Sequence, residues 1–167
     1  GDLDYVASAS TAFTAAAQGA PVRVIMATTT GGIWALMGSH GVNTPQDLKG
    51  KPVGMSARGT SLEYAVRESL TRLGLDPDKD VTMVVISGGA PQLVALRAGA
   101  AGAIAMPPPW NNQAKEEGFK ELIHTADVVS FPSNGLGAST VKLKQNPDQV
   151  KRMIKATFKS QVYMRDH

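Results

Sequence analysis

One stretch of the sequence, from Asp47 to Leu75, constrains the fold more than any other. A short apolar run, Pro52–Met55, leads into a loop of small residues, and apolar residues then repeat at helical spacing until Gly74. This order predicts a strand, a loop and an amphipathic helix. Such a loop collects free backbone N–H groups at the positive end of the helix dipole, and these favour a bound anion.

The loop at the start of this helix is the first candidate site. Residues 54–61 read G-x-x-x-x-G-T-S, which lacks the lysine of the phosphate-binding pattern G-x-x-x-x-G-K-[ST], so we predict a small carboxylate or sulfonate rather than a nucleotide. Arg58 could pair with such an anion, although loop arginines are commonly solvated. Simple helix capping is the open alternative. The candidates in this loop are Ser56, Arg58, Gly59, Thr60 and Ser61.

The change from apolar run to small-residue helix start recurs along the chain. It appears at Ser8–Thr11, Ser56–Ser61, Ser87–Gly89 and Pro107–Trp110, and each follows a predicted strand. Alternating strands and helices predict an α/β fold with mostly parallel strands. Ligands in such sheets bind beyond the carboxyl ends of the strands, so these four starts are expected near a ligand.

Composition narrows the function classes. The chain has 167 residues, a length typical of one domain, and no cysteine, which excludes disulfides, thiolate metal sites and cysteine nucleophiles from it. The three histidines His40, His124 and His167 lack metal-ligand spacing, and no acid–base pair stands out, so we predict neither metal, cofactor nor enzyme activity.

Positive charge gathers in the last predicted helix, which runs from Pro147 to about Arg165 with apolar residues along one face. The segment 142–167 contains the basic residues Lys142, Lys144, Lys151, Arg152, Lys155, Lys159 and Arg165. Asp148 and Asp166 are its acidic residues. No aromatic residues interleave in the way a nucleic-acid surface needs, so we predict a solvated helix face and no nucleic-acid partner.

Several segments together resemble a known family. They are D-Y-V-A-S-A-S-T-A-F near the start, T-P-Q-D-L-K-G-K-P-V-G-M-S-A-R-G-T-S, G-L-D-P-D-K-D-V-T, Q-L-V-A-L-R-A-G and P-P-W. In this order the chain resembles the periplasmic solute-binding proteins of ABC importers, in the nitrate/sulfonate/taurine branch that includes the thiamine-precursor-like subfamily. The resemblance covers essentially the whole chain.

The resemblance implies a type II periplasmic-binding-protein-like α/β fold. Residues 31–130 would form a complete second lobe. Residues 1–30 would hold part of the first lobe and a first crossing strand, and residues 131–167 a second crossing segment and the return to the first lobe. The family's first strand–helix–strand segment and the terminal part of the first lobe have no counterpart here, so we expect a truncated homologue. A homodimer that compensates for the incomplete first lobe is a further hypothesis.

The resemblance also implies further candidates around an interlobe cleft. A polar set, implied as ligand donors at the first helix start and on the crossing segments, comprises Ser8, Ser10, Thr11, Thr28, Thr30 and Asn134. Pro107 and Trp110 would form an apolar wall. Helix caps, ordinary strand threonines and a core tryptophan are the structural alternatives, and the sequence leaves them open.

The function implied is the extracytoplasmic solute-binding component of an ABC importer. It would capture a small, anionic, sulfonate-, nitrate- or carboxylate-like solute and deliver it to a permease in the membrane, in a periplasmic or extracytoplasmic location. One alternative is the ligand-sensing domain of a transcription regulator, which would need a helix-turn-helix segment. The other is a thiamine-pyrimidine-synthase-like enzyme, which would need a cysteine-rich iron motif and a cofactor lysine.

Overall fold

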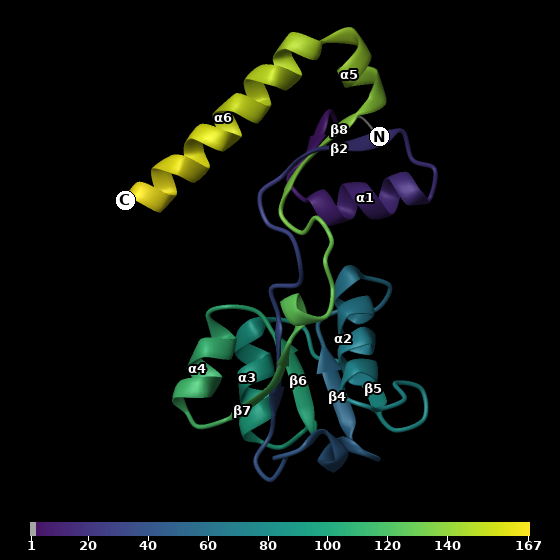
Figure 1. Cartoon of the computed structure of the whole chain (residues 1–167), viewed down its shortest axis with the longest axis vertical. Helices are drawn as coiled ribbons and strands as arrows, with labels where there is room; N and C mark the ends of the chain where they lie inside the picture. Colours follow the sequence, from purple (N-terminus) through teal and green to yellow (C-terminus); the bar gives the residue numbers. More distant parts are fainter. Residues whose placement is uncertain (1–2) are drawn as a thin grey trace. The chain divides into compact units, whose positions relative to one another are not determined.

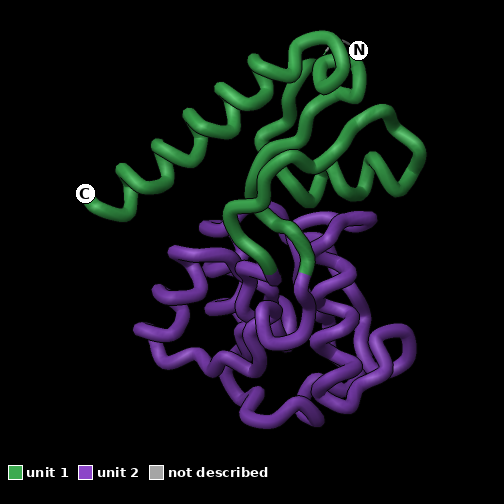
Figure 2. Tube along the Cα trace, turned by 45° about the horizontal axis from the view of Figure 1, so that its top comes forward, with its two compact units in different colours: residues 1–30, 131–167 green, residues 31–130 purple. Residues whose placement is uncertain are grey.

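The computed structural model describes residues 3–167 and divides them into two compact units. Unit 1 combines residues 1–30 with 131–167, and unit 2 contains residues 31–130 (Figure 2). The chain therefore leaves unit 1 once, forms unit 2 and returns. Within residues 3–167 no helix combines the length and the apolar character needed to span a bilayer.

Unit 2 is built on a five-stranded sheet with the order β5-β4-β6-β3-β7. β4 pairs in parallel with both β5 and β6, whereas β3 runs antiparallel to β6 and β7. The strands are β3 (Ala35–Gly38), β4 (Pro52–Met55), β5 (Thr82–Val85), β6 (Ala103–Met106) and β7 (Lys120–His124). Two 3-10 turns, η1 (Pro45–Leu48) and η2 (Thr125–Asp127), complete the connections.

The strands of unit 2 alternate their side chains between two apolar layers. Leu36, Val53 and Ala105 pack with the buried residues of α2 (Ser61–Arg72), while Met37, Ile104 and Met106 pack with those of α3 (Gly89–Arg97) and α4 (Trp110–Glu116). Helices thus cover both faces of the sheet (Figure 1). This burial on both faces explains why β3 and β6 are continuously apolar in sequence.

Unit 1 is smaller and entirely antiparallel. Its sheet has the order β1-β8-β2, and β8 pairs with both neighbours. The strands are β1 (Tyr5–Val6), β2 (Val22–Ala27) and β8 (Gly135–Ser139), and the helices are α1 (Ala9–Ala17), α5 (Thr140–Gln145) and α6 (Pro147–Asp166). The segments that leave and enter the unit pair through an antiparallel bridge between Thr30 and Pro132.

The α/β class is confirmed, but the prediction of mostly parallel strands is wrong. Parallel pairing is confined to β4 with β5 and β6, and all pairings of β3, β7 and unit 1 are antiparallel. An apolar run such as Val22–Ala27 is compatible with either direction, because burial sets its composition while distant partners set its direction. β2 pairs with β8 and is half-buried along most of its length.

The sequence reading also missed β8 and α5. Gly135–Ser139 contains two glycines and looks like a turn, yet it is the central strand of unit 1. A Cβ at Gly137 would lie 2.4 Å from the Cβ of Ala12, and one at Gly135 would lie 2.1 Å from the carbonyl oxygen of Met26. The glycines are therefore required by close packing of the helix and the neighbouring strand.

Candidate functional site

Three of the predicted helix starts lie together at one edge of unit 2. β4, β5 and β6 are parallel neighbours, so the loops that follow Met55, Val85 and Met106 leave the sheet at the same edge. We call this the carboxyl edge of unit 2. It brings together Ser56–Ser61, Ser87–Gly89 and Pro107–Trp110, and this is the position at which α/β sheets hold ligands.

The first loop forms the N-terminus of α2. Thr60 is the N-cap residue, and its hydroxyl accepts a hydrogen bond from the N–H of Glu63 at 3.4 Å. The carbonyl of Thr60 accepts from the N–H of Tyr64, so the N–H groups of Ser61 and Leu62 come before the first N–H that donates within the helix. Both capping and anion binding are therefore compatible with this loop: Thr60 caps the helix, and two backbone donors remain at its start.

Arg58 and Gly59 already have protein partners. The Nη2 of Arg58 donates to the carbonyl oxygen of Met83 at 2.6 Å, and its Nη1 lies 4.0 Å from Oε1 of Glu63. The N–H of Gly59 donates to Oε2 of Glu63 at 2.6 Å. Glu63 therefore occupies one donor of the loop, and its negative charge would oppose an incoming anion.

The second loop packs against both the first and the third. The hydroxyl of Ser87 donates to the carbonyl oxygen of Ser56 at 2.9 Å, which ties the loops after β4 and β5 together. Gly89, at the start of α3, lies directly against the indole of Trp110, because a Cβ at Gly89 would lie 1.8 Å from Cδ1 and Nε1 of that ring. Trp110 is half-buried, and Pro107, also half-buried, follows β6 directly.

The remaining predicted site residues lie in unit 1, at the end of the sheet where the chain enters and leaves. Ser8 caps α1 by accepting from the N–H of Thr11 at 3.2 Å, and its hydroxyl lies 2.9 Å from that of Thr11 and 3.3 Å from that of Ser10. The N–H of Ser10 donates to the carbonyl oxygen of Ser133 at 3.1 Å. The start of α1 is thus joined to the segment before β8.

The two crossing segments are hydrogen-bonded to each other within unit 1. The N–H of Thr28 donates to the carbonyl oxygen of Asn134 at 2.9 Å, and the N–H of Asn134 donates to the hydroxyl of Thr29 at 3.2 Å. Thr30 and Asn134 are exposed, and Thr28 is half-buried. The predicted residues of unit 1 therefore form a contiguous polar cluster around the start of α1.

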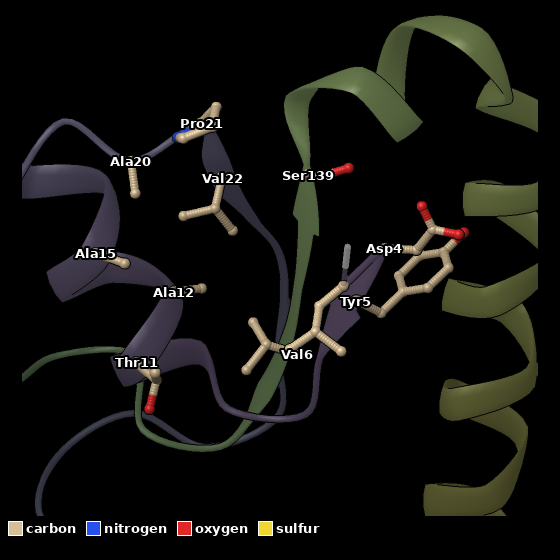
Figure 3. Close-up of a pocket in the computed structure, with 11 residues that line it drawn as sticks. Asp4, Tyr5, Val6, Thr11, Ala12, Ala15, Ala20, Pro21, Val22 and Ser139 are labelled. Carbon is tan, nitrogen blue, oxygen red and sulfur yellow. The ribbon is translucent and has the colours of Figure 1, made fainter. Parts of the chain in front are cut away.

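Unit 1 also contains a pocket at the other end of its sheet. It has a volume of about 290 Å³ and lies between α1 and the ends of β1 and β2, with Val6, Ala12, Ala15 and Val22 among its lining residues (Figure 3). Of the predicted site residues, only Thr11 lines it. Its walls are mainly apolar, so it does not resemble the anion site predicted from the sequence.

The sequence reading overlooked two contributors to the carboxyl edge. Glu63, three residues after the N-cap Thr60, follows the capping-box spacing, and this signal was available in the sequence. The hydrogen bond between Ser87 and Ser56 depends on the pairing of β4 with β5, so the residues around Ser56 alone could not predict it. Within residues 3–167 no group of three or more acidic or histidine side chains is placed to hold a metal ion.

Comparisons with solved structures show a shared fold. The periplasmic aliphatic sulphonate binding protein SsuA from Escherichia coli is 20% identical with a TM-score of 0.71, and the match covers 98% of this chain and 59% of that one. The periplasmic nitrate-binding protein NrtA from Synechocystis PCC 6803 is 16% identical with a TM-score of 0.68, and the match covers 90% of this chain and 44% of NrtA. The desulfurization enzyme DSZB is 18% identical with a TM-score of 0.62, and the match covers 88% of this chain and 57% of DSZB.

The chain thus spans about half the length of these structures, which include both solute-binding proteins and an enzyme. No curated protein sequence matches it significantly. A family model described as NMT1/THI5 like, by contrast, matches residues 1–167, the full sequence. The chain therefore belongs to the NMT1/THI5-like family.

Proposed function

We propose that this chain is part of an extracytoplasmic solute-binding component of an ABC importer, and that it captures a small organic anion such as a sulfonate or carboxylate. The observation that carries the proposal is the N-terminus of α2 at the carboxyl edge of unit 2. There the N–H groups of Ser61 and Leu62 come before the first N–H that donates within the helix, that of Tyr64, and lie at the positive end of the helix dipole.

The chemistry gathered at this edge suits binding rather than catalysis. Its three loops supply backbone N–H groups, hydroxyls, one guanidinium and the indole of Trp110. The one carboxylate that the described residues place at this edge, that of Glu63, accepts from the N–H of Gly59 and lies 4.0 Å from Arg58, so it is engaged with the loop itself. The names of the solute-binding proteins that share this fold support the same function.

The donors at the start of α2 and the indole of Trp110 together indicate a solute that has both a charged group and an apolar portion. The N–H groups at the start of α2 would hold the charged group, and Trp110, beside Gly89 at the start of α3, would contact an apolar portion. In unit 1 the cluster of Ser8, Ser10, Thr11, Thr28, Thr30 and Asn134 is proposed as a second polar surface for the solute. A permease in the membrane is the proposed partner.

The experiment is a thermal-shift screen that uses a substitution of a single backbone donor. Ser61 is the first residue of α2, where proline is well tolerated, and Thr60 before it is extended (φ −114°, ψ 166°), as proline requires. Ser61→Pro therefore removes one N–H group and the hydroxyl while keeping the helix. Ser61→Ala is the matched control, because it removes the hydroxyl alone.

The screen compares alkanesulfonates, taurine, nitrate, aliphatic and aromatic carboxylates, and uncharged analogues. A ligand at 100 times its Kd stabilises the native state by about 2.7 kcal/mol, so a selective anion gives a clear rise in Tm. We expect Ser61→Ala to retain that rise and Ser61→Pro to lose most of it. An equal rise in both variants would place the anion elsewhere, and no rise with any anion would contradict the proposed function.

A further inference from the structure

The parallel ladder between β4 and β6 stops before either strand ends. Its two rungs pair Val53 with Ala103 and Gly54 with Ile104. Both strands nevertheless continue with their other neighbours, because Met55 pairs with Val85 of β5 and Ala105 pairs with Leu36 of β3. The sheet of unit 2 is therefore split between β4 and β6 at its carboxyl edge.

The rung that is missing from this ladder is one particular hydrogen bond. The carbonyl oxygen of Met55 faces β5, where it accepts from the N–H of Ile86 at 2.8 Å. Because successive residues of a central strand bond to opposite neighbours, the next N–H, that of Ser56, belongs to the β6 side. In the register of the ladder it would donate to the carbonyl oxygen of Ala105. That bond is not formed, and among the described residues the N–H of Ser56 has no hydrogen-bond partner.

A side chain from α3 takes the acceptor that Ser56 leaves. The Nε2 of Gln92 donates to the carbonyl oxygen of Ala105 at 3.3 Å, and Gln92 is only 1% exposed. Its neighbours in this layer of the core, Leu93 and Ile104 among them, are apolar. Burying a carboxamide in such a layer costs free energy that an apolar side chain would avoid, and its hydrogen bond offsets that cost. Gln92 thus occupies the one carbonyl that would close the split.

Ser56 is held on the β5 side of the split. Its carbonyl oxygen accepts from the hydroxyl of Ser87 at 2.9 Å, so the chain turns toward the loop after β5 as soon as β4 ends. The split also separates the two helices that follow these strands, because α2 packs on one face of the sheet and α3 on the other. A change of face between consecutive helices marks the point at which α/β sheets bind ligands.

We propose that Gln92 is a positioning residue. By occupying the carbonyl oxygen of Ala105 it keeps the ladder between β4 and β6 open, and the N–H of Ser56 stays free to donate to the anionic group of the solute. The identity of the ligand rests on the proposed function, whereas the open ladder is a property of the free chain. Ser56 adds a third backbone donor to those of Ser61 and Leu62 in the same loop. Hydrogen bonds to ionised groups are stronger than those between neutral groups, so the loss of one donor changes the affinity measurably.

Amide hydrogen exchange, followed residue by residue by NMR, tests the open ladder without any ligand. In the unaltered chain we expect the protection factor of Ser56 to be at least about tenfold below that of Ile86, whose N–H is hydrogen-bonded to β4. Gln92→Met keeps the length of the side chain but removes the donor, so the carbonyl of Ala105 becomes available and the protection of Ser56 should rise at least about tenfold. Gln46→Met is the matched control, because it makes the same change at an exposed position in η1, before β4 begins.

Calorimetric titration with sodium methanesulfonate tests whether the solute uses this donor. We expect Gln92→Met to raise the Kd at least about tenfold, because one charge-assisted hydrogen bond is lost, and Gln46→Met to leave the Kd unchanged. Thermal melts followed by circular dichroism check that both variants are folded.

The outcomes separate the parts of the proposal. A Ser56 amide as protected as that of Ile86 in the unaltered chain, or one that Gln92→Met does not protect further, would overturn the open ladder. Protection of Ser56 in Gln92→Met with an unchanged Kd would overturn its use by the solute. Failure of the unaltered chain to bind methanesulfonate would overturn the donor role together with the proposed sulfonate ligand, and the exchange measurements would still decide whether Gln92 keeps the ladder open.

Discussion

The two units of this chain differ in how completely they bury their apolar side chains. Unit 2 covers both faces of its five-stranded sheet with helices, and Leu36, Leu70 and Ile104 in its two core layers are fully buried. Unit 1 has three strands, a pocket between α1 and the ends of β1 and β2, and a helix α6 on which Met153, Phe158 and Met164 are exposed. The comparison teaches that most of the buried apolar side chains of this chain lie in unit 2, on both faces of one sheet.

The largest expected effect comes from truncating the core of unit 2. Leu70 is fully buried between α2 and the sheet, so Leu70→Ala is expected to lower the free energy of unfolding by about 2–5 kcal/mol. Met153→Ala on α6, where the side chain is partly exposed, should cost well under half as much. Urea unfolding, followed by circular dichroism, measures the free energy of unfolding of both variants. Similar decreases in the two variants would contradict the difference between the units.

A smaller effect is expected at the carboxyl edge of unit 2. Gly89→Ala places a Cβ where the indole of Trp110 now lies, so either the ring or the start of α3 must shift, at a cost of about 1–3 kcal/mol. The chain has two tryptophans, so a Trp34→Phe background isolates the emission of Trp110. We expect Gly89→Ala to change that emission and Ala90→Ser, at the next and exposed position, to leave it unchanged. Unchanged emission in both would show that the contact is not tight.

The smallest effect distinguishes two hydroxyls, one in each unit. In unit 2 the hydroxyl of Thr125 donates to the carbonyl oxygen of Trp34 at 2.8 Å and accepts from its N–H at 3.1 Å. In unit 1 the buried hydroxyl of Tyr5 has no hydrogen-bond partner among the described residues. Thr125→Val should therefore cost about 1–3 kcal/mol, whereas Tyr5→Phe should be neutral or slightly stabilising. A clear loss in Tyr5→Phe would reveal a partner for that hydroxyl and a more complete unit 1.

Local sequence patterns predicted most helix starts and most strands of unit 2. Capping residues act within three residues of their partners, and the structure confirms Thr60 as an N-cap. At the first helix the N-cap is Ser8, whereas Ser10 and Thr11 were the predicted caps. The long helix at the C-terminus was also predicted, because its apolar face repeats at helical spacing. These features depend on neighbours in the chain and can be read without knowing the fold.

Pairing between distant strands could not be read in the same way. β3 pairs with β6 and β7, which lie more than 60 residues later, and nothing in Ala35–Gly38 specifies an antiparallel direction. β8 is a strand because β1 and β2 flank it and because Gly137 allows α1 to approach. At the site, the sequence left Arg58 either paired with an anion or solvated, and its hydrogen bond to the carbonyl oxygen of Met83 depends on the pairing of β4 with β5.

The central claim is that the carboxyl edge of unit 2 binds a small anion through the start of α2. Amide chemical shifts test it directly, since the N–H groups of Ser61 and Leu62 are the proposed donors. In a titration with methanesulfonate, with chloride as the control at equal ionic strength, we predict saturable shifts of these two amides and of the indole N–H of Trp110. The Ser61→Pro variant should lose the remaining shift at Leu62. Saturable shifts confined to unit 1, or none with any anion of the panel, would contradict the claim.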